Sequence, residues 1–288
     1  MPELPEVETV RKSLETAVVG ARVGHVEVGR ERSVRRTSPA MLSAGLIGNT
    51  FTTARRRGKY LLFDLSSRDT MMVHLRMSGR LLLADPTDAR EPHTHVVIRL
   101  VRSGHSDIDL RFVDPRTFGE VVVYDPNDID PNTNEAFLVP EVGRLGIDPL
   151  VDNFTFEEFR AAIGVRHRGA KAVLLDQSVI AGIGNIYVDE ILHRSRIRWN
   201  RPVSSLSIKQ LRLIHDSTIL ILNEAVAAGG STLKDMQYVD ALGREGIFQT
   251  EHKVYARQGE RCLSCARGVI RRVTGAGRST HFCPVCQR

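Results

Sequence analysis

The sequence predicts an α+β protein of several domains, because three kinds of segment follow one another along its 288 residues. Short β-prone runs separated by turn signals fill residues 22–125, a pattern typical of a β-sandwich or barrel. Helical periodicity dominates after about residue 150. All four cysteines follow residue 261, so they indicate a small local site rather than a disulfide framework.

The N-terminal part begins with a predicted helix over residues 5–19, for which Pro5 is a favourable first residue. Its apolar face holds Val7, Val10 and Leu14. Strands are predicted over residues 23–28, 59–65, 70–77, 80–84, 95–101, 108–113 and 120–124. Residues 125–135 (DPNDIDPNTNE) predict a surface loop, since Asp, Asn and Pro favour turns.

Capping signals divide the second half into helices. Thr155 with Glu158, and Ser207 with Gln210, have the spacing of capping boxes. The second of these pairs opens a long helix that we expect to end near Gly229-Gly230. Further helices are predicted over residues 171–181 and 185–195, the latter with Asn185 as N-cap, and a mobile loop is predicted over residues 231–255.

The strongest motif by spacing is Cys262-x2-Cys265-x17-Cys283-x2-Cys286. Two CxxC pairs complete a closed tetrahedral site of four thiolates, which indicates one structural Zn²⁺ rather than a catalytic metal. The intervening residues predict two short strands around Gly275 and Gly277, and therefore a zinc ribbon. A redox-active CxxC pair is the alternative. Residues 257–288 hold seven arginines and one acid, a charge pattern typical of nucleic-acid binding.

The formal net charge is +6 and the sequence pI is about 9.4. Basic runs at residues 30–36, 55–59, 166–171 and 194–201 suit a long polyanion, and a set of solvated faces is the alternative. We expect a cytoplasmic protein, because the first residues lack the apolar core of a signal peptide and no window is apolar enough to span a membrane.

The glycine-rich segment AGIGNIY (181–187) joins two predicted helices. Gly182 and Gly184 would let backbone N–H groups face outward at the start of the helix that Asn185 opens, an arrangement that binds phosphate. Glycines at such corners also occur for steric reasons alone.

The first residues, MPELPEVE, place Pro2 directly after the initiator Met. Removal of Met1 would leave a secondary amine whose pKa is about 7.7–8 in model peptides. Such an amine can attack an aldehyde-like carbon and form an iminium, with Glu3 and Glu6 close enough in sequence to move protons. The alternative is a helix start with acids matched to its dipole and a proline without a role.

Six motifs resemble, in order and from end to end, those of the formamidopyrimidine-DNA glycosylase/endonuclease VIII family: MPELPEVE, GKYLL, HLRMSGRL, DPRTFG, AGIGNIYVDE and GRSTHFCPVCQ. The resemblance implies a bifunctional glycosylase and AP lyase that excises oxidised purines from damaged double-stranded DNA. It also implies an N-terminal β-sandwich with a flanking helix (1–138), a helix–two-turn–helix domain with a lesion loop (139–256) and a zinc ribbon (257–288). We expect a monomer that works at the nucleoid, without a membrane partner.

The resemblance also assigns roles to single residues. It implies Pro2 as the nucleophile, Glu3 as the acid/base, Glu6 as a supporting carboxylate, Lys59 as a phosphate contact and proton carrier in β-elimination, and Arg278 as the group assisting δ-elimination. Asn185 and its turn are similar to a phosphate clamp. Met77, Arg116 and Phe118 resemble the trio that fills the gap left by a flipped base, which costs a few kcal/mol to extrude. His93 and Arg166 match DNA-contact positions.

Three of these residues have a structural alternative: Lys59 as a solubility lysine on an edge strand, Met77 as core filler and Phe118 as an inward strand residue. Thr117 departs from the family, which often has arginine there, and Arg166 stands where lysine is common. Two other functions stay open, an endonuclease VIII-type enzyme for oxidised pyrimidines and a zinc-ribbon DNA-binding protein without activity. Leu4, Arg116 and Phe118 favour the purine enzyme.

Overall fold

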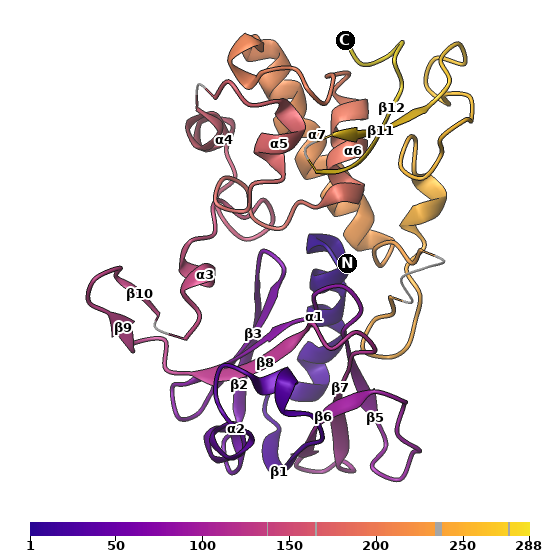
Figure 1. Cartoon of the computed structure of the whole chain (residues 1–288). Coiled ribbons are helices and arrows are strands. Elements are labelled where there is room, and N and C mark those ends of the chain that lie inside the picture. Colours follow the sequence, from indigo (N-terminus) through magenta and orange to yellow (C-terminus); the bar gives the residue numbers. More distant parts are fainter. Residues whose placement is uncertain (137, 165, 234–237, 276) are drawn as a thin grey trace. The chain divides into compact units, whose positions relative to one another are not determined.

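The structure is a computed structural model that describes residues 1–136, 138–164, 166–233, 238–275 and 277–288 (Figure 1). The chain divides into two compact units. The first comprises residues 1–144 and 229–246, and the second comprises residues 145–228 and 247–288. The expected division into three domains, with boundaries after residues 138 and 256, stays a prediction.

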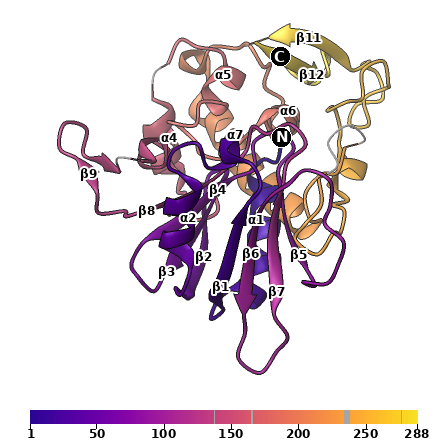
Figure 2. The same cartoon turned by 60° about the horizontal axis from the view of Figure 1, so that its bottom comes forward.

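The first unit contains two four-stranded antiparallel sheets. Strands β1 (Arg22–Val28), β6 (Thr94–Val101), β7 (Ile108–Val113) and β5 (Arg80–Ala84) pair in that order and lie side by side in Figure 2. The second sheet has the order β2 (Phe51–Arg57), β3 (Tyr60–Leu65), β4 (Thr70–His74) and β8 (Glu120–Tyr124). Every predicted strand is present, although β4 ends at His74 instead of continuing to Met77, and β2 was missed by the sequence reasoning.

One apolar core joins both sheets to helix α1 (Leu4–Val18). Val10 and Leu14 of the helix belong to the same buried cluster as Phe63 of β3 and Leu110 of β7. The helix begins one residue earlier than predicted and keeps the expected apolar face. Because α1 is fixed by this core, the residues that precede it are attached to a rigid support.

Shorter elements complete the first unit: η1 (Glu31–Val34), α2 (Pro39–Leu46), β9 (Ile129–Asp130), β10 (Glu135–Ala136) and α3 (Pro140–Gly143). Helix α2 was not predicted from the sequence. The segment expected to be a plain surface loop folds back on itself, since β9 and β10 pair antiparallel.

The second unit is built around α4 (Phe156–Ile163), α5 (Ala170–Leu174), α6 (Asn185–Arg194) and α7 (Ile208–Ala227), with η2 (Val203–Ser205) and η3 (Phe248–Glu251) between longer segments. Both predicted capping boxes are present, and α7 ends at its C-cap Ala228, directly before Gly229. Two predictions were wrong. Helix α5 stops at Leu174 instead of continuing to residue 181, and the N-cap of α6 is Gly184, so Asn185 is its first helical residue.

The C-terminal hairpin of strands β11 (Arg271–Gly275) and β12 (Arg278–Phe282) confirms the predicted pair of short strands. Trp199 packs directly on it, because a Cβ added to Gly275 would lie 2.5 Å from the indole ring. Among the described residues, no helix is both long and apolar enough to cross a bilayer. Residues 234–237 of the expected loop 231–255 lie outside the described part of the chain.

Candidate functional site

Pro2 and Glu3, which precede α1, are buried, and Glu6 fixes this segment. The backbone N–H of Glu3 donates to Glu6 Oε2 at 2.8 Å, and the N–H of Ser231 donates to Glu6 Oε1 at 2.7 Å. Glu6 is only 1% exposed, and Tyr238 donates to its carbonyl at 3.2 Å. The carboxylate therefore holds the segment carrying Pro2 against residues far along the chain. Glu6 also stabilises the start of α1, because it forms a capping box with Glu3. This agrees with the alternative of acids matched to a helix start.

Lys59 lies in the two-residue turn between β2 and β3, next to Gly58, whose φ is +56°. It is 7% exposed, which does not fit a lysine placed on an edge strand for solubility. Arg56 supports this turn, because its guanidinium donates to the Gly58 carbonyl at 2.9 Å and to Glu8 at 3.0 Å. The turn that carries Lys59 is thus tied through Arg56 to Glu8 of α1.

Met77, Arg116 and Phe118 lie in two turns, residues 75–79 and 114–119, that follow β4 and β7. Met77 and Phe118 are 39% and 41% exposed, so neither is core filler or an inward strand residue. The Arg116 guanidinium lies over the Phe118 ring, 5.1 Å from its centroid. An exposed thioether and an exposed ring covered by a planar cation are groups that can stack in DNA.

Thr117, between Arg116 and Phe118, has a φ of +56°. This left-handed conformation is an outlier for a β-branched residue. His93, the predicted DNA contact on the preceding segment, also has a positive φ, +68°. Arg76, the neighbour of Met77, has a φ of +53°, so unusual backbone occurs in each of the three segments that carry Met77, His93 and Arg116.

In the second unit, the glycine-rich segment leads into α6 as predicted, but its N–H groups are not all directed outward. The N–H of Gly182 donates to the Gln177 side chain at 3.0 Å, so it is not available for phosphate. Asn185 Nδ2 donates to Ser279 Oγ at 3.4 Å, and Asn185 Oδ1 is buried without a hydrogen-bond partner among the described residues. The structure therefore brings Asn185 beside Ser279, the neighbour of Arg278.

Arg278 is the first residue of β12 and is exposed. Arg166 instead donates to the Ala162 carbonyl at 2.5 Å and also to the carbonyl of Ile163. Its guanidinium thus caps the C-terminus of α4, and its predicted contact with DNA stays a prediction.

Sequence reasoning missed a buried ion pair that holds β12 against the helices. Lys171 Nζ donates to Asp189 Oδ1 at 2.8 Å and to the Ser279 carbonyl at 2.9 Å, while Asp189 Oδ2 accepts the His281 N–H at 2.8 Å. Both charged side chains are fully buried. Lys171 belongs to a basic run that indicated a solvated or DNA-binding face, so its sequence neighbours gave no sign of burial.

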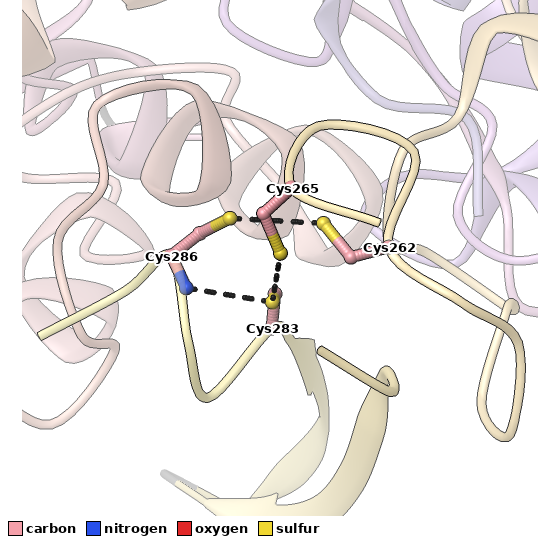
Figure 3. Close-up of side chains that lie close together, drawn as sticks. All are labelled: Cys262, Cys265, Cys283 and Cys286. Carbon is pink, nitrogen blue, oxygen red and sulfur yellow. Dashed lines mark hydrogen bonds between the residues drawn. The ribbon is translucent and has the colours of Figure 1, made fainter. Parts of the chain in front are cut away.

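The four cysteines of the ribbon converge as predicted (Figure 3). Cys262 Sγ lies 3.7 Å from Cys286 Sγ, and Cys265 Sγ lies 3.8 Å from Cys283 Sγ. Tetrahedral ligands about 2.3 Å from zinc stand about 3.8 Å apart, so the sulfur positions fit Zn²⁺. The geometry agrees with a closed structural site.

The surroundings of the sulfur atoms shift the thiol pKa values in both directions. The backbone N–H of Gly268, 3.3 Å from Cys265 Sγ, lowers the pKa of that thiol to about 6. Burial raises the pKa of Cys286, a shift that a bound cation reverses, since coordination deprotonates a thiol. His193 Nε2 lies 3.5 Å from Cys262 Sγ, and burial lowers the pKa of His193 to about 4, which leaves a neutral imidazole beside the cluster.

Comparison with known proteins identifies this arrangement. Models of the formamidopyrimidine-DNA glycosylase N-terminal domain and H2TH domain match residues 1–121 and 145–237. The formamidopyrimidine-DNA glycosylase of Heliobacterium modesticaldum is 41% identical over 292 residues, and the alignment covers 100% of both chains.

Two solved structures agree over nearly the whole chain. A complex of wild-type Lactococcus lactis Fpg with DNA containing N7-benzyl-Fapy-dG has a TM-score of 0.86 at 36% identity and covers 100% of both chains. Its complex with abasic-site DNA has a TM-score of 0.86 at 35% identity and covers 99% of each. The resemblance predicted from the motifs is confirmed, and the chain belongs to the formamidopyrimidine-DNA glycosylase family.

Proposed function

We propose that this protein is a bifunctional DNA glycosylase and AP lyase that excises oxidised purines, 8-oxoguanine and formamidopyrimidines, from damaged double-stranded DNA. The observation that carries the proposal is the full-length similarity to formamidopyrimidine-DNA glycosylases. The structural relatives support it further, because they were solved with DNA containing a formamidopyrimidine or an abasic site.

The reaction begins at the imino terminus that Pro2 presents once Met1 is removed. Its nitrogen lone pair attacks C1′ of the flipped nucleotide, the bond from C1′ to the purine breaks, and the base leaves with a proton. Opening of the sugar ring gives an iminium between Pro2 and C1′. This electron sink acidifies the C2′ proton, so its removal expels the 3′ phosphate. A second elimination expels the 5′ phosphate, and water then releases the sugar fragment from Pro2.

The other catalytic roles follow from chemistry. Glu3, adjacent to the nucleophile, protonates the ring oxygen as the sugar opens. Glu6 supports it by fixing the terminus through its bonds to Glu3 and Ser231. Lys59 contacts a phosphate and moves a proton in β-elimination, and Arg278 assists δ-elimination through a bidentate phosphate contact.

Binding of the duplex uses a second group of residues. Met77, Arg116 and Phe118 enter the stack and replace the contacts of the extruded nucleotide. Asn185, His93 and Arg166 contact the DNA backbone. The helix dipole supports this role for Asn185, because the residue opens α6 and therefore lies at the positive end of that helix.

Cys262, Cys265, Cys283 and Cys286 would hold one Zn²⁺, which supplies folding free energy to the ribbon and no reaction chemistry. The ion would keep β12 formed and thereby keep Arg278 in place. We also propose that the enzyme acts as a monomer in the cytoplasm at the nucleoid, with DNA as its partner and no membrane partner.

Borohydride trapping tests the chemistry. Wild-type protein incubated with abasic duplex DNA should give a covalent adduct, and peptide mapping should locate it at Pro2. Pro2→Gly should abolish excision of 8-oxoguanine and strongly reduce the adduct. Pro5→Ala, a proline substitution inside α1, is the matched control and should keep both. An adduct on a lysine, or no adduct from wild type, would refute the proposal, and the latter would favour a binding protein without activity.

Substrate choice separates the purine enzyme from the endonuclease VIII type. We expect 8-oxoguanine to be excised from duplexes faster than thymine glycol. The opposite order would assign the protein to the pyrimidine enzymes.

A further inference from the structure

The two turns that carry Met77, Arg116 and Phe118 meet at one side chain that had no assigned role, Asp114. Its Oδ1 accepts the Ser78 hydroxyl at 2.5 Å and the Arg116 N–H at 3.2 Å. Its Oδ2 accepts the Phe118 N–H at 2.8 Å. Asp114 is 0% exposed, so it cannot itself reach DNA.

The same oxygen and the backbone of Asp114 extend these links. Oδ2 also accepts the Gly119 N–H at 2.7 Å. The Asp114 N–H donates to the His93 carbonyl at 3.0 Å, and its own carbonyl accepts His95 Nε2 at 2.8 Å. Asp114 therefore connects three separate segments, each of which carries a predicted DNA contact.

Arginines hold the second turn from its carbonyl side. Arg32 Nε donates to the Thr117 carbonyl at 3.2 Å, and Arg35 donates to the carbonyls of Phe118 and Gly119 at 3.4 Å. With its N–H groups bound to Asp114 and its carbonyls bound to arginines, the turn has little freedom to rearrange.

The first turn is held at its other end by Glu120. This buried carboxylate accepts Arg76, the neighbour of Met77, at 3.1 Å and Arg36 at 2.8 Å. Burial alone would raise the pKa of Glu120, but the hydrogen bond and charge of Arg36, with the charge of Arg35 and the hydrogen bond of Arg76, hold it below its ordinary value. Glu120 thus remains an anion to which the Met77 turn is tied.

We propose that Asp114 is a positioning residue for base eversion: it joins the two turns into one pre-formed wedge without touching the substrate. Flexible turns would have to be ordered while the duplex is being opened, whereas a rigid wedge meets that cost during folding. The inference rests on the proposed function, because it assumes that Met77, Arg116 and Phe118 enter the DNA stack.

Asp114→Asn tests this inference. The amide has nearly the same size, but its NH₂ group faces backbone donors, so at least one turn N–H loses its acceptor. Asp125→Asn is the matched control, since Asp125 also accepts a turn N–H, that of Asn127, but carries no DNA contact. The measurements are single-turnover excision of 8-oxoguanine from a duplex, 2-aminopurine fluorescence opposite the lesion, and lyase activity on a single-stranded abasic oligonucleotide.

Asp114→Asn should lower the rate of excision from the duplex and the rate of the 2-aminopurine fluorescence change, each roughly ten- to hundredfold. This factor corresponds to the loss of a charge-assisted hydrogen bond. Lyase activity on the single strand should not change, because no stacked base has to be replaced there. Duplex affinity should change little, because phosphate contacts dominate it. The Asp125 control should behave as wild type in every assay.

Equal losses on single-stranded and duplex DNA would show that Asp114 serves only the fold, and unchanged excision from the duplex would also overturn the inference. If Asp114→Asn does not fold, Ser78→Ala tests the inference instead, because it removes only the hydrogen bond that links the two turns. It should give the same duplex-specific loss at smaller size, whereas Ser67→Ala, at an exposed turn serine, should not. Absence of lyase product from wild type on the single strand would instead refute the proposed function.

Discussion

The N-terminal sandwich and the C-terminal ribbon are both built of antiparallel strands, yet different forces stabilise them. The sandwich has an apolar core to which two sheets and α1 contribute, with Phe63 and Leu110 among its fully buried members. In the described part of the ribbon, the buried cluster comprises Val254, Cys262, Ile270 and Cys283, with Val285 and the other two cysteines partly buried against it. So few apolar side chains cannot offset the entropy of ordering the segment, and the metal has to supply the difference.

This difference matches the roles proposed for the two regions. The nucleophile and the wedge need positions fixed to a fraction of an ångström, which a large packed core provides. The ribbon needs only to present Arg278 to a phosphate. Its attachment to the helical segments includes a buried ion pair, Lys171 with Asp189, in addition to the packing of Trp199 on Gly275. The following predictions test how far the two regions depend on separate forces.

The largest effect is expected from removing the metal with a chelator. The ribbon should unfold, since structural zinc contributes about 10–16 kcal/mol in small zinc domains, and duplex affinity should fall steeply. Trp199, the only tryptophan in the sequence, packs on Gly275 of the ribbon, so its fluorescence should report the change. Backbone NMR signals of the sandwich should keep their positions. Added zinc should restore the Trp199 fluorescence and the duplex affinity. Unchanged Trp199 emission and affinity would mean that the ribbon is stable without metal.

Asp189→Asn should destabilise the second unit by about 3–5 kcal/mol, because it leaves the Lys171 ammonium buried without a counter-charge. Urea unfolding followed by Trp199 fluorescence measures the loss. Glu251→Gln removes an exposed ion pair with Lys253 in the same unit and should cost less than about 1 kcal/mol. Equal effects of the two variants would show that the Lys171–Asp189 pair does not hold the ribbon.

Acid should weaken the sandwich through His74. Burial, with the charge of Arg76 second, lowers the pKa of this imidazole to about 3, against about 6.5 in an unfolded chain. Below pH 6.5 the unfolded state binds a proton that the folded state does not, so stability is full above that value and falls as pH drops toward 3. The loss between pH 7 and pH 5 should be about 2 kcal/mol.

Hydrogen exchange of β3 and β4 at the two pH values measures that loss. His74→Gln should flatten the part of the pH dependence that comes from His74, while other titrating groups affect both proteins equally. An identical slope in wild type and variant would exclude His74 as its source.

The smallest effect is expected at the start of α7. Ser207→Ala removes the hydroxyl that accepts the Gln210 N–H and should cost about 1 kcal/mol. Ser204→Ala, in the same region, serves as control and should be nearly neutral. Trp199 fluorescence in urea resolves the two, and equal midpoints would mean that the helix start is stabilised by packing alone.

The sequence was informative where local signals govern structure. Alternating apolar residues predicted the strands, and the capping pairs predicted α4 and α7. Strand β2 escaped because its sequence, FTTARRR, is mostly polar and it lies at the edge of its sheet. Asn185 was assigned as N-cap by residue type, whereas glycine takes that position.

The site was predictable residue by residue only through the resemblance to a family, and its supporting residues were not. Lys171 meets Asp189 and Ser279 across 18 and 108 positions of sequence, a separation that no local pattern encodes. Asp114 stands before a proline at a turn, so a turn-capping role was foreseeable in principle. Its link to Ser78, 36 residues away, was not.

The left-handed backbone of Thr117 means that a substitution there can raise thermal stability and lower the rate of repair. Holding a β-branched residue in that conformation costs about 1–3 kcal/mol, which glycine or asparagine at this position would recover. A screen that rewarded only survival at high temperature would therefore select such replacements. The selected variants would have higher thermal stability. Their more flexible turn would, however, slow the detection of damaged bases.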